Sequence, residues 1–204
     1  MTAKDLLNLN GDFRSSPLLD TARKLHKLFA RQDIAYVIIG GLSVIRNRAV
    51  RTTQDVDLLV RKKDWPQIQE ALADGFAIEI DSAGSSSAVD RDTNVPVDIW
   101  FADGNGPMVI PLPDPVEVLE YDSVLQANFL TLSAILELKI ATYLQKKRDE
   151  GIEIAAKDLA DVVELLKNNQ ENLSPELFAG FHPRIRRELK RIHKKIHRRI
   201  KRSP

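Results

Sequence analysis

Two glycines and a pair of alternating aspartates constrain this chain more than any other feature. Gly40 and Gly41 end an apolar run, and Asp55 and Asp57 follow fourteen and sixteen residues after Gly41. Side chains two apart on a strand point to the same side of the sheet. The sequence therefore predicts a strand, a glycine turn, a helix and a second strand that presents two carboxylates together. Such a pair repels itself unless a cation lies between the groups, and Mg²⁺ prefers these oxygen ligands.

A third carboxylate lies later in the chain, in a segment that is otherwise apolar. Asp98 is flanked by Val97 and Ile99. A lone carboxylate in an apolar strand is costly unless it is paired or binds a metal. The ordinary alternative is an edge-strand charge that prevents aggregation. The glycines suit the same chemistry, because Gly40 and Gly41 let the backbone turn tightly and approach a phosphate at the start of a helix.

The spacing of apolar residues predicts the order of the remaining elements. We expect helices over residues 18–30, 42–48 and 64–74, and strands over 36–39, 55–60, 76–80, 88–91 and 95–101. Further helices follow over 132–147 and 157–166, from 174 and from 184 onward. The pattern predicts an α+β or α/β fold with a mixed sheet flanked by helices and followed by C-terminal helices. We expect a catalytic domain over 1–120, a helical segment over 121–183 that closes over the nucleotide, and a basic helix over 184–204.

The absence of cysteine and of long apolar runs indicates the cellular location to expect. The 204 residues include no cysteine, which excludes disulfides and thiolate metal sites and fits a reducing compartment. No apolar run approaches the roughly 20 residues that a membrane-spanning helix needs. We therefore expect a cytoplasmic protein without a membrane partner.

The C-terminal segment carries a large excess of positive over negative charge. Residues 184–204 hold eleven Lys or Arg and one Glu, a local charge of +10, so the rest of the chain carries −9. An apolar stripe runs through this segment, formed by Ile185, Leu189, Ile192, Ile196 and Ile200. Two interpretations are compatible: the stripe docks on the core, and the cations contact the phosphates of an RNA. Membranes and partner proteins remain alternatives for such a helix.

The ordered motifs resemble the active site of the DNA polymerase β-like nucleotidyltransferase superfamily. The segments 40–43 and 51–60 look like the form found in AbiEii-like nucleotidyltransferase toxins and related bacterial proteins, and the segments 131–139 and 157–162 fit the same group more weakly. The resemblance covers residues 34–167. It implies a transferase that moves a nucleoside monophosphate from an NTP such as ATP to an acceptor hydroxyl or phosphate.

The resemblance also implies roles for individual residues. Asp55, Asp57 and Asp98 would hold two Mg²⁺ ions, and Asp98 would also deprotonate the attacking hydroxyl. Nucleotide-binding roles would fall to Gly40, Gly41, Ser43, Arg51 and Lys139. The acceptor stays open among an RNA or tRNA end, a protein side chain and a small molecule such as an aminoglycoside. A toxin–antitoxin role would add an antitoxin protein as partner.

Several of these residues also have a purely structural interpretation. Lys139 is by default a surface lysine, and Lys157, Asp158 and Asp161 are interpreted as ion pairs that stabilise their own helix. Trp100 and Tyr143 are predicted to be core residues rather than base-stacking platforms. The rival function is a non-catalytic module of the same fold that binds NTP or RNA, against which the complete set of three acids argues.

Overall fold

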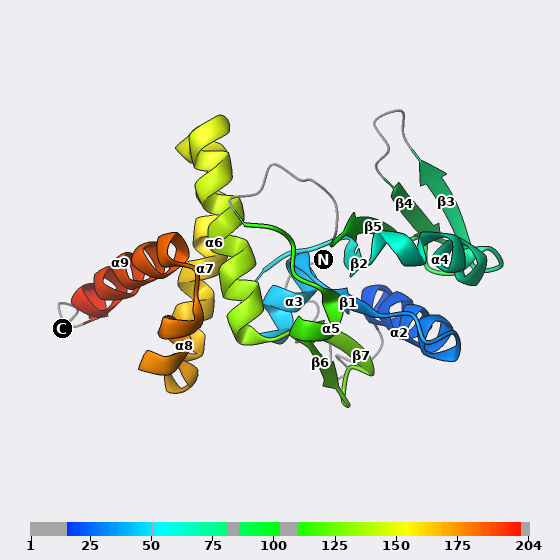
Figure 1. Ribbon diagram of the computed structural model, residues 1–204, viewed down its shortest axis with the longest axis horizontal. Coiled ribbons are helices and arrows are strands. Elements are labelled where there is room, and N and C mark those ends of the chain that lie inside the picture. Colours follow the sequence, from blue (N-terminus) through cyan, green and yellow to red (C-terminus); the bar gives the residue numbers. More distant parts are fainter. Residues whose placement is uncertain (1–15, 50, 81–85, 103–109, 201–204) are drawn as a thin grey trace. The chain divides into compact units, whose positions relative to one another are not determined.

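The computed structural model describes residues 16–49, 51–80, 86–102 and 110–200 (Figure 1). The chain divides into two compact units. The first, called the sheet unit here, runs to Thr131. The second, the helical unit, begins at Leu132 and also takes in the short segment 47–49.

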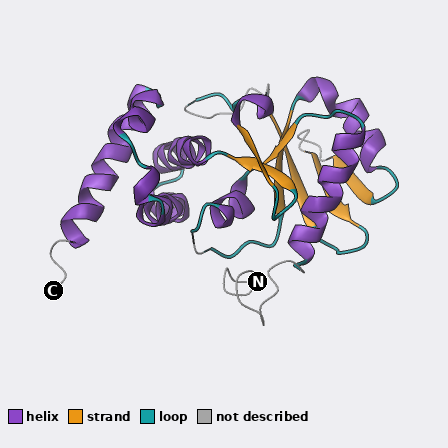
Figure 2. Ribbon diagram, turned by 90° about the horizontal axis from the view of Figure 1, so that it is seen from below, coloured by secondary structure: helices purple, strands orange, loops and turns teal. Residues whose placement is uncertain are grey.

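The sheet unit contains one seven-stranded sheet, whose strands lie side by side in Figure 2. Its strand order is β3-β4-β5-β2-β1-β7-β6. The strands are β1 (Tyr36–Ile38), β2 (Val56–Val60), β3 (Phe76–Ile80), β4 (Ser86–Asp90), β5 (Pro96–Phe101), β6 (Leu119–Asp122) and β7 (Ala127–Leu130). The helices of this unit are α2 (Pro17–Arg31), α3 (Gly40–Arg46), the 3₁₀ turn η2 (Lys62–Asp64), α4 (Trp65–Leu72) and α5 (Pro115–Val118).

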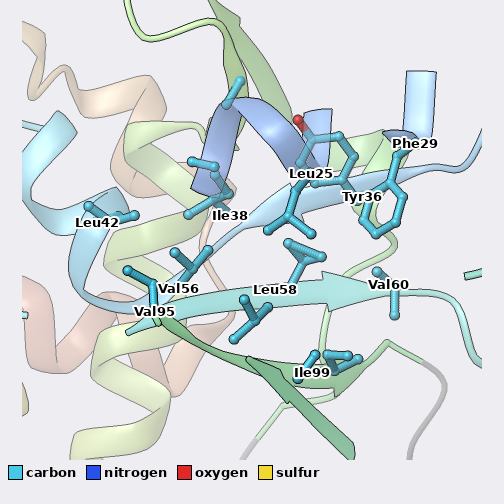
Figure 3. Packing of buried hydrophobic residues seen from close by; sticks show 14 of the residues in the cluster. Leu25, Phe29, Tyr36, Ile38, Leu42, Val56, Leu58, Val60, Val95 and Ile99 are labelled. Atoms are coloured by element: carbon cyan, nitrogen blue, oxygen red, sulfur yellow. The ribbon is translucent and has the colours of Figure 1, made fainter. Parts of the chain in front are cut away.

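The sheet is mixed, as the sequence predicts. β2 runs parallel to β5 and β1 runs parallel to β7, whereas the other neighbouring strands are antiparallel. The strands expected over 88–91 and 95–101 form the antiparallel hairpin of β4 and β5. The alternate residues Val56, Leu58 and Val60 of β2 point to one side, where they pack with buried residues of α2 (Figure 3). Buried residues of α4 belong to the same cluster. The main hydrophobic core therefore lies on that side of the sheet.

The opposite side of the sheet carries the acids. On β5, Val97 and Ile99 belong to the core, so Asp98 and Trp100 point to the other side. Trp100 is 49% exposed, and the prediction that it is a core residue is wrong. Its apolar character suggested burial, but its position two residues after Asp98 places it on the face that the acids occupy.

A hairpin that the sequence pattern did not predict completes the sheet. β6 and β7 pair antiparallel, and β7 joins β1, so the sheet extends to Leu130. Arg46 of α3 binds Glu120 and Asp122 of β6 with its guanidinium at 2.8 and 3.1 Å. The boundary expected at residue 120 consequently falls inside β6.

The helical unit consists of α6 (Leu132–Asp149), α7 (Ile152–Asn168), the 3₁₀ turn η3 (Gln170–Asn172), α8 (Pro175–Gly180) and α9 (Pro183–Ile200). Tyr143 of α6 is buried, which confirms its prediction as a core residue. In the described part of the chain, none of the helices combines the length and the apolar character that crossing a membrane requires.

Candidate active site

Strand register brings two of the three predicted acids side by side. Asp57 on β2 is the register partner of Asp98 on the parallel strand β5. Both side chains point away from the main core, because their neighbours Val56 and Val97 are fully buried on the other side. Asp55 directly precedes β2 and lies near enough for its charge to act on Asp98. The structure thus gathers Asp55, Asp57 and Asp98 at one place on the sheet.

The glycine turn is shaped around one of these carboxylates. Gly40 has a φ of +60°, and a Cβ added to it would lie 1.7 Å from Oδ2 of Asp57. The backbone N–H of Gly41 donates to the same oxygen at an N···O distance of 3.4 Å. A side chain at position 40 is therefore excluded both by the backbone conformation and by Asp57. The sequence pattern predicts the turn, but it indicates that the glycines allow the backbone to approach a phosphate and gives no sign that Gly40 makes room for Asp57.

Thr53 is a site residue to which the sequence pattern gave no role. Its buried hydroxyl donates to Oδ1 of Asp55 at 2.6 Å, which fixes the orientation of that carboxylate. A Cβ on Gly41 would meet the Thr53 hydroxyl at 2.3 Å and Nε of Arg51 at 3.2 Å. Gly41 thus allows Thr53 and Arg51 to approach the turn. The signal in the sequence was its place in the segment 51–60, two positions before Asp55.

The electrostatics of the site favour a bound cation. Burial, followed by the negative charge of Asp55, raises the pKa of the Asp98 carboxyl above its ordinary value. A divalent ion would relieve both effects, and the donors are carboxylate oxygens of the kind that Mg²⁺ prefers. Within the described residues, no three acidic or histidine side chains are already close enough to hold a metal. Two of the acids are instead oriented by protein groups, Asp57 by Gly41 and Asp55 by Thr53.

Ser43 does not join this group. It is fully buried in α3, and its hydroxyl accepts a hydrogen bond from the backbone N–H of Leu130 at 3.2 Å. This hydrogen bond attaches α3 to β7. The structure therefore places Ser43 where it positions the helix that follows the glycine turn.

Lys139 lies in the helical unit and is buried rather than a surface lysine. Its Nζ is 3.2 Å from Oδ1 of Asp158 and 2.9 Å from Oδ2 of Asp161, both on α7. Lys146 binds the second oxygen of Asp158 at 2.9 Å. The prediction that Asp158 and Asp161 form ion pairs within their own helix is therefore corrected, because these lysines lie on α6 and the ion pairs join the two helices.

Substituting Gly40 with Ala is expected to disable the site. The new Cβ must displace the Asp57 carboxylate, and the left-handed backbone adds a cost of about 1–2 kcal/mol. We expect the affinity for Mn²⁺, measured by calorimetry, to fall at least about tenfold. Gly151→Ala is the matched control, because Gly151 also has a positive φ but nothing within 4 Å of an added Cβ. Equal Mn²⁺ affinity in the two variants would contradict the role assigned to Gly40.

Comparisons with known proteins agree with this geometry at the level of the fold. No protein-family model and no curated protein sequence matches the chain. Solved structures do match it. ANT(2'')-Ia in complex with adenylyl-2''-tobramycin is 13% identical, with 91% of this chain and 99% of that chain covered and a TM-score of 0.54. The solution structure of the antibiotic-resistance factor ANT(2'')-Ia is 14% identical, with 89% and 92% covered and a TM-score of 0.51.

A third similar structure comes from Paracoccidioides brasiliensis. It is an antigenic nucleotidyltransferase-like protein, 14% identical over 81% of this chain and 85% of that chain, with a TM-score of 0.50. The mixed sheet, its flanking helices and the C-terminal helices are common to these comparisons. The chain therefore has the nucleotidyltransferase fold.

Proposed function

We propose that this protein is a Mg²⁺-dependent nucleotidyltransferase that moves a nucleoside monophosphate from an NTP to an acceptor. The observation that carries the proposal is the register of Asp57 beside Asp98, with Asp55 adjoining and the Gly40–Gly41 turn against Asp57. Three carboxylates on, or directly before, neighbouring strands have little structural use of their own, since each destabilises the others. They are well suited to holding cations that bind a triphosphate.

The three acids would hold two Mg²⁺ ions. Such ions stabilise charge on the attacking and leaving oxygens of an in-line displacement. The acceptor oxygen forms a bond to the α-phosphorus, and the bond from that phosphorus to its bridging oxygen breaks, so that pyrophosphate leaves with the electron pair. Asp98 would accept the acceptor's proton, the role that the resemblance to the superfamily implies for it.

Nucleotide contacts would come from the turn and from cations. Gly40 and Gly41 allow close backbone approach, and Arg51 lies against Gly41, where its guanidinium can neutralise phosphate charge. Ser43 would act by positioning α3. A contact of Lys139 with the triphosphate stays a prediction, because two carboxylates already share its charge in the helical unit.

RNA is the acceptor that the exposed charge of α9 favours. The apolar stripe of this helix is buried in its own unit at Ile185, Leu189, Ile192 and Ile196, while Ile200 lies outside the residues whose side chains are described. The stripe is therefore not available to enter a membrane. Among the described side chains of the helix, six cations are exposed: Arg184, Arg187, Lys190, Arg191, Lys194 and Lys195. Cations arranged in this way suit the phosphates of a nucleic acid.

The position of the label on the NTP tests the reaction. Each NTP would be supplied with ³²P at the α- or the γ-phosphate, with Mg²⁺ and with total RNA, a protein lysate or tobramycin as acceptor. We expect α-label on RNA, no γ-label and one pyrophosphate per transfer. Transfer of γ-label would indicate a kinase. NTP or RNA binding without any turnover would indicate the non-catalytic module.

A toxin role, an antitoxin partner and a cytoplasmic location stay predictions.

RNA binding at several salt concentrations tests α9. Replacing Arg187, Lys190 and Lys194 with Gln is expected to weaken binding and to lower the slope of log K against log salt by about 0.7–0.9 for each phosphate that the helix no longer neutralises. Gln at the exposed cations Lys62, Lys63 and Lys157 is the control. Equal salt slopes for the two triple variants would contradict the proposal that α9 binds RNA phosphates.

A further inference from the structure

Trp100 is the one large exposed aromatic residue on the strand that carries Asp98. It is 49% exposed although its strand lies inside the sheet, between β2 and β4. Trp100 and Asp98 are two residues apart, so their side chains leave the same face and their Cα atoms are about 7 Å apart. That spacing is close to the length of one nucleoside. A ligand group that reaches the carboxylates can therefore rest on the indole.

The backbone beneath Trp100 is held rigidly. The next residue, Phe101, points to the opposite side and packs edge-on against Trp65, with ring centroids 5.4 Å apart. The backbone N–H of Ala102 donates to the carbonyl of Val60 at 2.8 Å, which continues the pairing of β5 with β2. Trp100 consequently presents its ring from a fixed strand and not from a loop, as a preorganised binding platform requires.

Strand order tells which substrate lies nearest to Trp100. The glycine turn follows β1, which lies on one side of β2, whereas β5 lies on the other side of β2. A triphosphate at Gly40 and Gly41 would therefore occupy the β1 side of the acids. Asp98 and Trp100 lie on the far side, where the acceptor hydroxyl must approach if Asp98 takes its proton. The indole is thus placed beside the acceptor and not beside the NTP.

We propose that Trp100 is a stacking platform for the terminal nucleobase of an RNA acceptor, an inference that rests on the proposed function. The choice of a nucleobase follows from the flat, half-exposed ring that leaves the same face of β5 as Asp98. The terminal nucleotide of an RNA acceptor supplies a π-face for this ring and a hydroxyl for the acids. Stacking on an aromatic side chain accepts any base, so Trp100 fixes the position of the last nucleotide and not its identity.

Fluorescence can report this stacking without any turnover. The chain contains two tryptophans, so Trp65→Phe leaves Trp100 as the sole indole. This variant would be titrated, with Mg²⁺ and no NTP, with a hexaribonucleotide and with the same hexamer lacking its 3′-terminal base. We expect saturable quenching by the intact hexamer, and binding about 5- to 150-fold weaker for the abasic one. Trp100→Phe in the full chain should bind the intact hexamer almost as well, and Trp100→Ala should lose the preference for it.

The outcomes separate this inference from the proposed function. Equal binding of the two hexamers, or no quenching, overturns the platform even if α-label transfer is observed. Quenching by tobramycin but not by the hexamer also overturns it and points to a sugar acceptor. Base-dependent quenching without label transfer supports the platform while it counts against the transferase. Where transfer occurs, Trp100→Ala should raise KM for RNA and leave KM for NTP unchanged, a split that loss of folding would not produce.

Discussion

Replacing Asp57 with Asn is expected to lower the rate of nucleotide transfer by about 10³-fold or more. Asn has nearly the shape of Asp and still offers an oxygen to the Gly41 N–H, so the glycine turn should keep its conformation. What the variant loses is a charged metal ligand between Asp55 and Asp98. Groups that stabilise charge developing in the transition state contribute about 10²–10³-fold each, and a metal-binding carboxylate should lie at or above that range.

Stability measurements make this prediction specific. Asp57→Asn removes one of three like charges, so the temperature of unfolding should stay the same or rise. Glu79→Gln is the matched control, because Glu79 is an exposed acid on the same sheet. Glu79 is the register partner of Ser87 on β4, and Ser87 is the register partner of Asp98 on β5. The control should keep its activity within about threefold. An active Asp57→Asn enzyme, or an Asn variant that is inactive only because it unfolds, would contradict the assignment.

The local pattern predicted the acid site because its parts are set by strand periodicity. Alternation in β2 places Asp57 on the side away from the main core, and the apolar neighbours of Asp98 do the same on β5, whereas Asp55 directly precedes β2. That Asp57 and Asp98 are register partners depends on the parallel pairing of β2 with β5, two strands with two others between them in sequence. Pairing of that kind is decided by tertiary packing and is not encoded in either segment alone.

The wrong prediction for Trp100 and the missed hairpin of β6 and β7 have different physical causes. Trp100 could have been placed correctly, since the alternation that exposes Asp98 also exposes the residue two positions later. The hairpin of β6 and β7 was harder to find, because no residue of the short strand β6 is buried and the strand therefore lacks a buried apolar face. Arg46 and two acids secure it, and such long-range ion pairs have no signature in sequence.

The sequence motif around Lys139 predicted neither the burial of this lysine nor its ion pairs with α7. A lysine on a helix is usually at the surface, but this one is only 8% exposed and bonds two carboxylates of α7. Burial by itself would raise the pKa of Asp158, yet the charges of Lys139 and Lys146 outweigh burial and hold that pKa below its ordinary value. The network therefore stabilises the folded helical unit above the pKa of an unfolded Asp, and this contribution is lost as the pH falls through the lowered value.

Replacing Lys139 with Met is consequently expected to destabilise α6 and α7 by about 3–5 kcal/mol, because it leaves buried carboxylates short of a cation. Hydrogen exchange of the amides in these two helices measures the effect within the helical unit. Lys157→Met is the matched control, since Lys157 is exposed on α7 and its loss should cost less than about 0.5 kcal/mol.

The pH dependence distinguishes this explanation from simple loss of packing. Without Lys139, Asp158 keeps only Lys146 of the two cations that lower its pKa, so its carboxyl takes up a proton at a higher pH than in the wild type and the deficit relative to wild type shrinks as the pH falls. Lys139→Met combined with Asp158→Asn should likewise recover part of the lost stability at neutral pH. A deficit that is the same at about pH 7 and about pH 4.5 would contradict the electrostatic account. If Lys139→Met leaves exchange in α6 and α7 unchanged but raises KM for NTP, the lysine serves the nucleotide, as the sequence motif implies, and the two carboxylates are its positioning partners.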